Sequence, residues 1–302
     1  MNFPKPLKKG DTVALIAPAS SVEHLEIEAC ISTLEGMGYK VKIGESINKK
    51  HGFLSAPDDI RARDINTFFS DSDVNGIICL RGGYGSARIL PLIDWSLIKE
   101  NPKFFMGFSD ITALHICLNQ NSNLITFHGP MVHSNFLMNP NEHTTMSFFR
   151  IMDQGGKYKN PPGRALTTIR EGQGSGRLVG GNLTLIASTL GTPYEIDTEG
   201  NILVIEDVLK DTYQLDRLFT QLKQAGKFSK LRGILIGDFK GCEPKRTGDQ
   251  TLDDLVLDHL LPLNVPIIGN LGIGHCTPMS TLPLGAICHM DAKEKKIQFS
   301  YT

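Results

Sequence analysis

Three polar residues lie in sequence settings where a nucleophile, a base and a carboxylate could act together. Ser109 is in the segment GFSD at 107–110, between an apolar run and a helical pattern. Glu206 directly follows an apolar run, and His275 follows the segment GIG. A histidine that is oriented by a carboxylate can remove the proton of a serine hydroxyl, which makes the serine a nucleophile. The order Ser…Glu…His therefore predicts acyl-transfer chemistry.

The segment around Ser109 has the pattern of a nucleophile at a turn between a strand and a helix. Backbone N–H groups and the helix dipole at such a turn stabilise developing negative charge. The match to the hydrolase pattern G-x-S-x-G is incomplete, because Ile111 stands where that pattern has glycine. The alternative is that Ser109 and Asp110 cap the helix, which serine and aspartate commonly do after a strand.

Consecutive glycines follow another predicted strand, in the segment RGGYG at 81–85. At Gly82 and Gly83 the backbone amides could form a cradle for a phosphate or for the oxyanion of an acyl-transfer intermediate. The segment fails as a dinucleotide fingerprint because Arg88 takes the place of the last glycine, and no G-x-x-x-x-G-K-[ST] occurs in the chain. The alternative is a tight turn without a ligand.

No metal site is expected, because His128 and His133 lack the third ligand that zinc requires. Together with the missing nucleotide motifs, this predicts a reaction that uses no metal and no other cofactor.

The first half of the chain alternates short apolar runs with helical patterns. The runs at 13–17, 39–43, 76–80 and 104–108 predict strands, and the intervening segments predict helices, the first of them opened by a capping box at Ser20 and Glu23. Strands that are apolar throughout and alternate with helices are typical of a parallel sheet with both faces covered. The carboxyl ends of such strands are where α/β proteins position their functional groups.

The character of the sequence changes after residue 150, where methionine, asparagine, glycine and proline replace the periodic pattern. We therefore expect an N-terminal α/β domain at 1–150, a crossing linker at 151–176 and a smaller C-terminal α+β or barrel-like domain at 177–302. Short strands near 203–205, 233–236, 267–268, 286–290 and 297–300 and a helix near 215–225 are expected in the last part.

Composition excludes several classes of function. The chain has 302 residues, with 31 Lys and Arg against 32 Asp and Glu, so it lacks the basic excess of proteins that bind nucleic acid. No apolar run reaches the ~18 residues of a membrane span. The six cysteines are widely spaced without a C-x-x-C pair, which favours buried, reduced thiols and a cytoplasmic protein.

Eight segments, in order, resemble the L,D-carboxypeptidases of the serine-peptidase group that also contains the microcin-immunity peptidases. They are KGD at 9–11 with the strand to Pro18, RARD at 61–64, RGGYG at 81–85, GFSDIT at 107–112, HGP at 128–130, GGNL at 180–183, ED at 206–207 with Asp216-Arg217, and GH at 274–275.

This resemblance implies that Ser109 is the nucleophile and that Glu206 and His275 complete the triad between two domains. The oxyanion would then lie between the N–H of Asp110 and that of Gly83 or Gly82. It also implies a homodimer that removes terminal D-alanine from cytoplasmic cell-wall peptides, without a nucleic-acid or membrane partner. Arg81, Arg170 and Arg217 are candidates for binding the D-alanine carboxylate.

The sequence is compatible with two other functions. One is the hydrolysis of peptidyl nucleotides, as in the microcin-immunity branch. That branch often stacks an adenine on a tryptophan, and the single tryptophan here, Trp95, lies in the predicted N-terminal domain. The other is a non-catalytic binder that uses the loop at 81–85 to hold a phosphate or a carboxylate.

Overall fold

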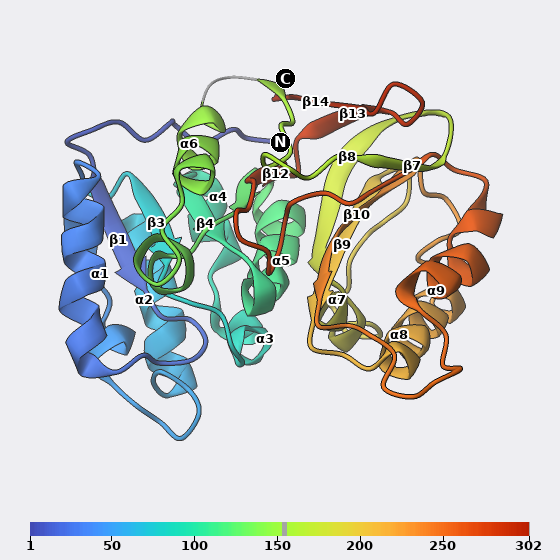
Figure 1. Cartoon of the computed structure of the whole chain (residues 1–302). Coiled ribbons are helices and arrows are strands. Elements are labelled where there is room, and N and C mark those ends of the chain that lie inside the picture. The colour runs from blue at the N-terminus through green and yellow to red at the C-terminus, as the bar shows by residue number, and fades with distance from the viewer. Residues whose placement is uncertain (153–155, 302) are drawn as a thin grey trace.

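The computed structural model describes residues 1–152 and 156–301. Within these residues the chain forms two sheets with helices packed against them (Figure 1). Helix α5 (Thr112–Ser122) lies between the two sheets. Its Leu114 belongs to the core of the first sheet, and its Ile116 packs into the core of the second. The helix that follows Ser109 therefore joins the two halves of the molecule.

The first sheet has six described strands in the order β12-β5-β4-β3-β1-β2. They are β1 (Thr12–Ile16), β2 (Lys40–Ile43), β3 (Gly76–Cys79), β4 (Phe104–Gly107), β5 (Thr126–His128) and β12 (Leu282–Leu284). All neighbours are parallel except β12, which pairs antiparallel with β5. The predicted parallel sheet is confirmed, but β5 and β12 have no counterpart among the predicted strands, and β12 comes from the last part of the chain.

Helices cover both faces of this sheet, as its apolar strands require. Val13 and Leu15 of β1 pack into the same cluster as α1 (His24–Gly36) and α6 (Glu142–Arg150). Ala14 and Ile16 point to the opposite cluster. The helices on that side are α2 (Asp58–Ser70), α3 (Ser86–Ile89), α4 (Trp95–Glu100) and α5.

The first helix begins later than expected. The predicted capping box at Ser20 and Glu23 is wrong: Glu23 is itself the N-cap of α1, and Glu26 is its partner in the box. The expected cap fails because Ser20 is held in the loop after β1, where its hydroxyl accepts a hydrogen bond from the N–H of Tyr84 at 3.2 Å.

The second sheet has eight described strands in the order β6-β14-β13-β8-β9-β10-β11-β7 and curls into a half-barrel. They are β6 (Gly156–Lys157), β7 (Thr167–Arg170), β8 (Gln173–Asn182), β9 (Ile202–Val208), β10 (Gly233–Lys240), β11 (Ile267–Gly269), β13 (Ile287–Asp291) and β14 (Lys296–Ser300). Strands β8 to β11 are parallel, and the outer pairs are antiparallel. The expected barrel-like second domain is confirmed.

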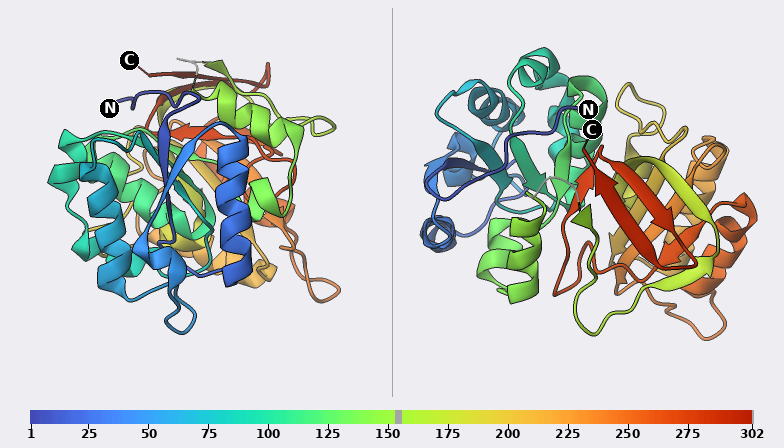
Figure 2. Two further views of the ribbon diagram at one scale, coloured as in Figure 1. Left: turned by 90° about the vertical axis from the view of Figure 1, so that its left-hand side faces the viewer. Right: turned by 90° about the horizontal axis from the view of Figure 1, so that it is seen from above.

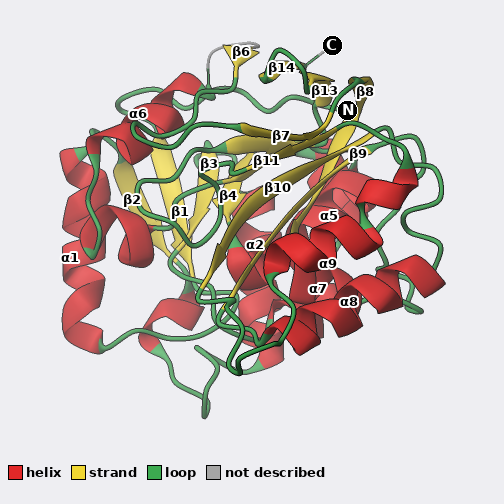
Figure 3. Ribbon diagram, turned by 45° about the vertical axis from the view of Figure 1, so that its right-hand side comes forward, coloured by secondary structure: helices red, strands yellow, loops and turns green. Residues whose placement is uncertain are grey.

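One face of the second sheet is covered by α7 (Leu183–Ser188), α8 (Thr212–Gln224) and α9 (Leu252–His259), which Figure 3 shows side by side. On its other face, Val204 and Leu235 pack against Met290 and Phe299 of β13 and β14. All six cysteines of the chain are unpaired and buried, as the sequence predicts.

The chain crosses between the two sheets more than once. The segment predicted as a linker, 151–176, contains β6, β7 and the start of β8, and β12 returns to the first sheet. The two ends of the chain lie near each other, with the rings of Phe3 and Tyr301 stacked at 4.1 Å between centroids (Figure 2). The division at 150 and 176 therefore stays a proposal.

Candidate active site

Ser109 lies at the carboxyl end of β4, on a sharp turn into α5. A single 3-10 turn at Ser109–Ile111 links the strand to the helix. Ser109 has φ +63°, a left-handed conformation that non-glycine residues seldom adopt outside constrained sites. A Cβ on Gly107 would lie 2.9 Å from a methyl carbon of Ile111, so this tight turn needs glycine there. The hydroxyl is thereby presented away from the sheet.

His275 lies against Ser109 from the loop that follows β11. Its Nε2 is 3.0 Å from Ser109 Oγ, and its Nδ1 is 2.6 Å from Oε2 of Glu206. Glu206 is fully buried within β9, whereas 18% of the His275 side chain is exposed. The ring of Phe108 packs edge-on against the imidazole at 5.0 Å between centroids. The three predicted residues therefore form one hydrogen-bonded chain from carboxylate to hydroxyl.

Close packing holds the carboxylate end of this chain. Gly274 has φ +90°, and a Cβ there would lie 2.4 Å from Glu206 Oε2. Glycine is needed at 274 because the backbone must pass directly over the carboxylate. Burial raises the pKa of the Glu206 carboxyl, and the hydrogen bond from His275 opposes that shift by favouring the anion. The Asn182 side chain also favours the anion.

The glycine-rich loop after β3 contacts the same serine. A Cβ on Gly82 would lie 3.1 Å from Ser109 Cβ, so the loop backbone touches the serine side chain. Gly83 has φ +120°, and no hydrogen bond joins its N–H to another described residue. The Asp110 carboxylate accepts hydrogen bonds from the N–H groups of Gly85 at 3.3 Å and Ser86 at 2.8 Å. The loop is thus tied to the residue that follows Ser109.

Asp110 itself is buried, and this raises the pKa of its carboxyl. Its N–H lies at the start of the 3-10 turn, where backbone donors lack a partner within the helix. The N–H groups predicted to bind an oxyanion therefore belong to two segments that converge on Ser109.

A cavity of about 480 Å³ opens beside Ser109 between the two sheets. On the N-terminal side it is lined by Tyr84 and Arg88, and on the C-terminal side by Asp207 and Lys210. Arg88 is paired with Asp58, whereas Lys210 has no acidic partner among the described residues. Within this part of the chain, the cavity therefore holds one unpaired cation, Lys210, in a lining that also contains the carboxylates of Asp110 and Asp207.

A polar wall of the cavity is fixed by Asp207. Its carboxylate accepts hydrogen bonds from Asn182 Nδ2 at 3.2 Å, from the Thr184 N–H at 2.9 Å and from the Thr184 hydroxyl at 2.7 Å. These contacts attach the start of α7 to β9, so the wall is part of the second sheet.

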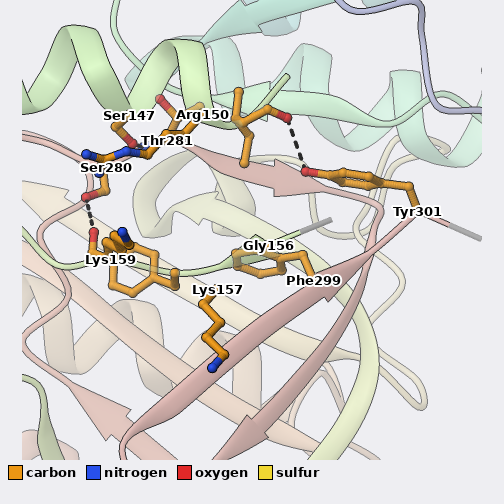
Figure 4. A pocket seen from close by; sticks show the side chains of 11 residues that line it. Ser147, Arg150, Gly156, Lys157, Lys159, Ser280, Thr281, Phe299 and Tyr301 are labelled. Atoms are coloured by element: carbon orange, nitrogen blue, oxygen red, sulfur yellow. Dashed lines mark hydrogen bonds between the residues drawn. The ribbon is translucent and has the colours of Figure 1, made fainter. Parts of the chain in front are cut away.

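A separate, smaller hollow of about 50 Å³ lies between α6 and β14 (Figure 4). Its lining includes Ser147, Arg150, Ser280 and Phe299, and the Ser280 hydroxyl donates to the carbonyl of Lys159 at 2.8 Å. None of the three triad candidates lines it, so the larger cavity is the candidate active site.

Two family models match the chain, one for each half. The model described as the LD-carboxypeptidase N-terminal domain matches residues 13–129, and the one described as the LD-carboxypeptidase C-terminal domain matches residues 175–290. A protein of Bacillus subtilis (strain 168), named a probable murein peptide carboxypeptidase, is 40% identical over 294 residues, which are 97% of this chain and 92% of that protein. The chain belongs to the LD-carboxypeptidase family.

Solved structures from both branches of the predicted group are similar to this chain. Muramoyltetrapeptide carboxypeptidase from Oxalobacter formigenes has a TM-score of 0.83 and 29% identity, over 95% of this chain and 97% of that one. Microcin C7 self immunity protein in complex with aspartyl sulfamoyl adenosine has a TM-score of 0.91 and 25% identity, over 99% and 98%. The predicted serine-type LD-carboxypeptidase family is confirmed, and so is the prediction that the chain is an enzyme. The alternative of a non-catalytic binder is therefore not supported.

The three arginines that are candidates for binding the D-alanine carboxylate make contacts outside the cavity. Arg170 bonds to the carbonyl of Leu261, Arg217 lies over the ring of Tyr213, and Arg81 bonds to the carbonyl of Ser21. None of these arginines lines the cavity.

The cations that do line the cavity, Arg88 and Lys210, were not among the predicted site residues, although Lys210 lies only four positions after Glu206. Trp95 packs against the core of the first sheet and does not line the cavity.

The described residues contain no cluster of three or more His, Cys, Asp or Glu that could hold a metal ion. No helix among them has both the length and the apolar character needed to cross a membrane.

Proposed function

We propose that this chain is a serine-type L,D-carboxypeptidase that removes the terminal D-alanine from muropeptide tetrapeptides. The observation that carries the proposal is the continuous chain of hydrogen-bonded groups from the buried Glu206 through His275 to Ser109. The substrate class is supported by the relatives, which are named a probable murein peptide carboxypeptidase and a muramoyltetrapeptide carboxypeptidase.

In the first step, Ser109 Oγ attacks the carbonyl carbon of the amide that joins the L-configured centre to D-alanine. His275 Nε2 takes the hydroxyl proton, and Glu206 holds the imidazole through Nδ1 and stabilises its charged form. The 3.0 Å and 2.6 Å distances suit these roles without rearrangement. The tetrahedral intermediate then carries its negative charge on the former carbonyl oxygen.

We assign this oxyanion to the N–H groups of Gly83, or Gly82, and Asp110. The assignment is supported by the contact of the loop with Ser109 and by the start of the helical turn at Asp110. Removing one such donor in other acyl-transfer enzymes costs about 2.7–4 kcal/mol of transition-state stabilisation.

The intermediate collapses when the C–N bond breaks and His275 gives its proton to the departing amine of D-alanine. The remaining peptide is then an ester of Ser109. Water attacks this ester, His275 accepts a proton from the water, and the proton returns to Ser109 as the ester bond breaks. The products are the tripeptide and free D-alanine, and neither step needs a cofactor.

The cavity suits a substrate that ends in a carboxylate. Lys210 supplies a cation without an acidic partner among the described residues, and Arg88, which is paired with Asp58, lies on the opposite wall. A C-terminal D-alanine carboxylate would be attracted to this region and would place the scissile amide near Ser109.

We place the reaction in the cytoplasm, in the recycling of cell-wall peptides, and propose that the active form is a homodimer. The six buried, unpaired cysteines support a reducing compartment. Sedimentation of the purified protein tests the dimer independently of activity.

The experiment that tests the function is incubation of the protein with a muropeptide tetrapeptide ending in D-alanine. Mass spectrometry should detect the loss of one alanine, and the epimer ending in L-alanine should remain intact. Ser109→Ala is the control for contaminating peptidases. An intact D-alanine substrate in the presence of folded protein would refute the proposal.

A second candidate function is the hydrolysis of peptidyl nucleotides. It is favoured by the TM-score of 0.91 with the microcin C7 self immunity protein. The same assay with aspartyl sulfamoyl adenosine separates the two. Turnover of this compound together with an intact tetrapeptide would select the second function.

A further inference from the structure

Arg61 in the first turn of α2 is the largest fully buried side chain of the described residues. Its guanidinium donates to several acceptors: Nε to the Ala56 carbonyl at 3.0 Å, Nη1 to the carbonyls of Pro18 and of Gly85 (2.9 Å), and Nη2 to the Asp58 carboxylate. Arginine is almost never fully buried unless its charge is paired. The function of Arg61 can therefore be inferred from the position of the backbone carbonyls that accept its hydrogen bonds.

Arg61 lies behind two loops that meet at the candidate oxyanion site. Pro18 belongs to the loop after β1, and Gly85 belongs to the glycine-rich loop after β3. The loops also contact each other through Ser20, whose N–H donates to the Gly82 carbonyl at 3.4 Å. A Cβ on Gly83 would lie 2.3 Å from Ser20 Oγ. A displacement of either loop would therefore move the Gly82–Gly83 backbone.

The backbone at Gly85 is held from two sides. Its carbonyl accepts from Arg61 Nη1 at 2.9 Å, and its N–H donates to Asp110 Oδ1 at 3.3 Å. Asp110 follows Ser109 directly, so the glycine-rich loop is fixed relative to the nucleophile by these two side chains. Asp110 binds only the N–H of Gly85 in this pair of contacts and does not reach the loop after β1, whereas Arg61 binds both loops.

We propose that Arg61 is a positioning residue of this active site. Its guanidinium sets the distance of the Gly82–Gly83 amides from Ser109 by holding the Gly85 and Pro18 carbonyls together. This inference rests on the oxyanion role given to those amides under the proposed function. Lysine cannot replace arginine here, because an ammonium group lacks the planar fork that reaches several fixed acceptors at once.

Asp58 connects this clamp to the wall of the cavity. Its carboxylate pairs with Arg61 on one side and accepts hydrogen bonds from Arg88 at 2.8–3.1 Å on the other. Removal of the Arg61 charge alone would leave Asp58 with one partner fewer. A test of Arg61 therefore needs a variant in which this carboxylate is neutral as well.

The first test variant is Arg61→Lys, with Arg63→Lys as the matched control. Arg63 lies on the same helix but is exposed and bonds only to Glu45 and Asp59. We expect Arg61→Lys to lower kcat by about 10- to 100-fold with KM within about threefold, because small displacements of transition-state donors are costly. The affinity for a phosphonate analogue of the tetrahedral intermediate should fall in parallel. The control should match the unsubstituted enzyme.

The second test variant is Asp58→Asn/Arg61→Gln, which replaces the ion pair by a neutral pair. Its control is Asp59→Asn/Arg63→Gln, which makes the same change in an exposed ion pair of the same helix. The Asp58→Asn/Arg61→Gln variant should show the same parallel loss of kcat and phosphonate affinity, and the control should stay within about threefold. All assays are run at a temperature where circular dichroism shows native structure.

Unchanged kcat and phosphonate affinity in either folded Arg61 variant would overturn the inference. It would also be overturned if both variants lost native structure at the assay temperature, because Arg61 would then act on the whole fold. Failure of the proposed function has a different signature, since the unsubstituted enzyme itself would neither cleave the tetrapeptide nor bind the phosphonate analogue.

Discussion

Ser109 Oγ and His275 Nε2 lie 3.0 Å apart although the two residues are 166 positions apart in the chain. The serine is at the end of a strand of the first sheet, and the histidine is in the loop after β11 of the second. The carboxylate that orients the histidine, Glu206, comes from a third strand, β9. The candidate site is therefore assembled by the contact between the sheets, and neither sheet carries it alone.

Substitution of the nucleophile or the base should remove nearly all turnover. We expect Ser109→Ala and His275→Ala each to lower kcat by several orders of magnitude, because the members of such a triad act as a unit. The double variant should lose little more than either single variant. Release of D-alanine measured by mass spectrometry provides the test, and additive losses would contradict the shared role.

Glu206→Gln tests the orientation of the imidazole. The glutamine side chain keeps the shape of the carboxylate but lacks its charge, so it favours the wrong tautomer of His275. By analogy with other triads, kcat should fall about 10⁴-fold. Thermal unfolding should show a folded protein. An activity within tenfold of the unsubstituted enzyme would mean that Glu206 serves only the packing of β9.

Gly83→Ala tests the oxyanion loop and should lower kcat by about 10²- to 10³-fold. The added methyl group would meet Ser20 Oγ at 2.3 Å and would strain a backbone with φ +120°. Ser20→Gly in the same chain removes the clash and should restore part of the activity.

Gly163→Ala is the control for strain alone, since Gly163 has φ +79° with nothing within 4 Å of an added Cβ. If it lost as much activity as Gly83→Ala, the effect would not be specific to the loop.

The buried His128 should make the protein less stable in acid. Burial lowers the pKa of His128 to about 3, and its two ring nitrogens have no partner among the described residues. In the unfolded chain the pKa of histidine is about 6.5. Between these values only the unfolded state binds the proton, so the contribution of His128 is complete above pH 6.5 and is lost as the pH falls.

His128→Phe should therefore flatten the pH dependence of the free energy of unfolding. The expected change in slope is about 1.4 kcal/mol per pH unit between pH 6 and 4. Urea unfolding at several pH values measures it. The control is His51→Phe at an exposed position, and equal slopes for His128→Phe and the unsubstituted protein would contradict the prediction.

The sequence predicts β1, β3 and β4 of the first sheet well because each is an apolar run that is followed by a helix. Leu15, Ile78 and Phe105 are all buried in this way. It misses β5, because Thr126–His128 is short and is not an apolar run. It also misses β12, since a three-residue strand, Leu282–Leu284, with a proline in its centre has no recognisable period. This strand is recruited by the open edge of β5, a tertiary effect that local pattern does not show.

The three triad candidates could be selected from the sequence because serine, glutamate and histidine each stand next to glycine or at a strand end. Lys210 and Arg61 could not be selected as site residues from the sequence, and the reasons differ. Lys210 is one of many lysines in polar segments, and only the contact between the sheets places it in the cavity. Arg61 lies in a helical pattern where arginine is ordinarily exposed, and only the three-dimensional structure shows that it is buried.

The pairing of β12 with β5 has a consequence for how the protein is made. Because the ribosome synthesises β12 last among the strands of the first sheet, the edge of β5 stays open until residues 282–284 have emerged. Contacts this distant in sequence slow folding and leave an unpaired strand edge exposed to aggregation during synthesis. His275 precedes β12 by only a few residues, so the closing of this edge and the arrival of the base at Ser109 both wait for the synthesis of the same segment.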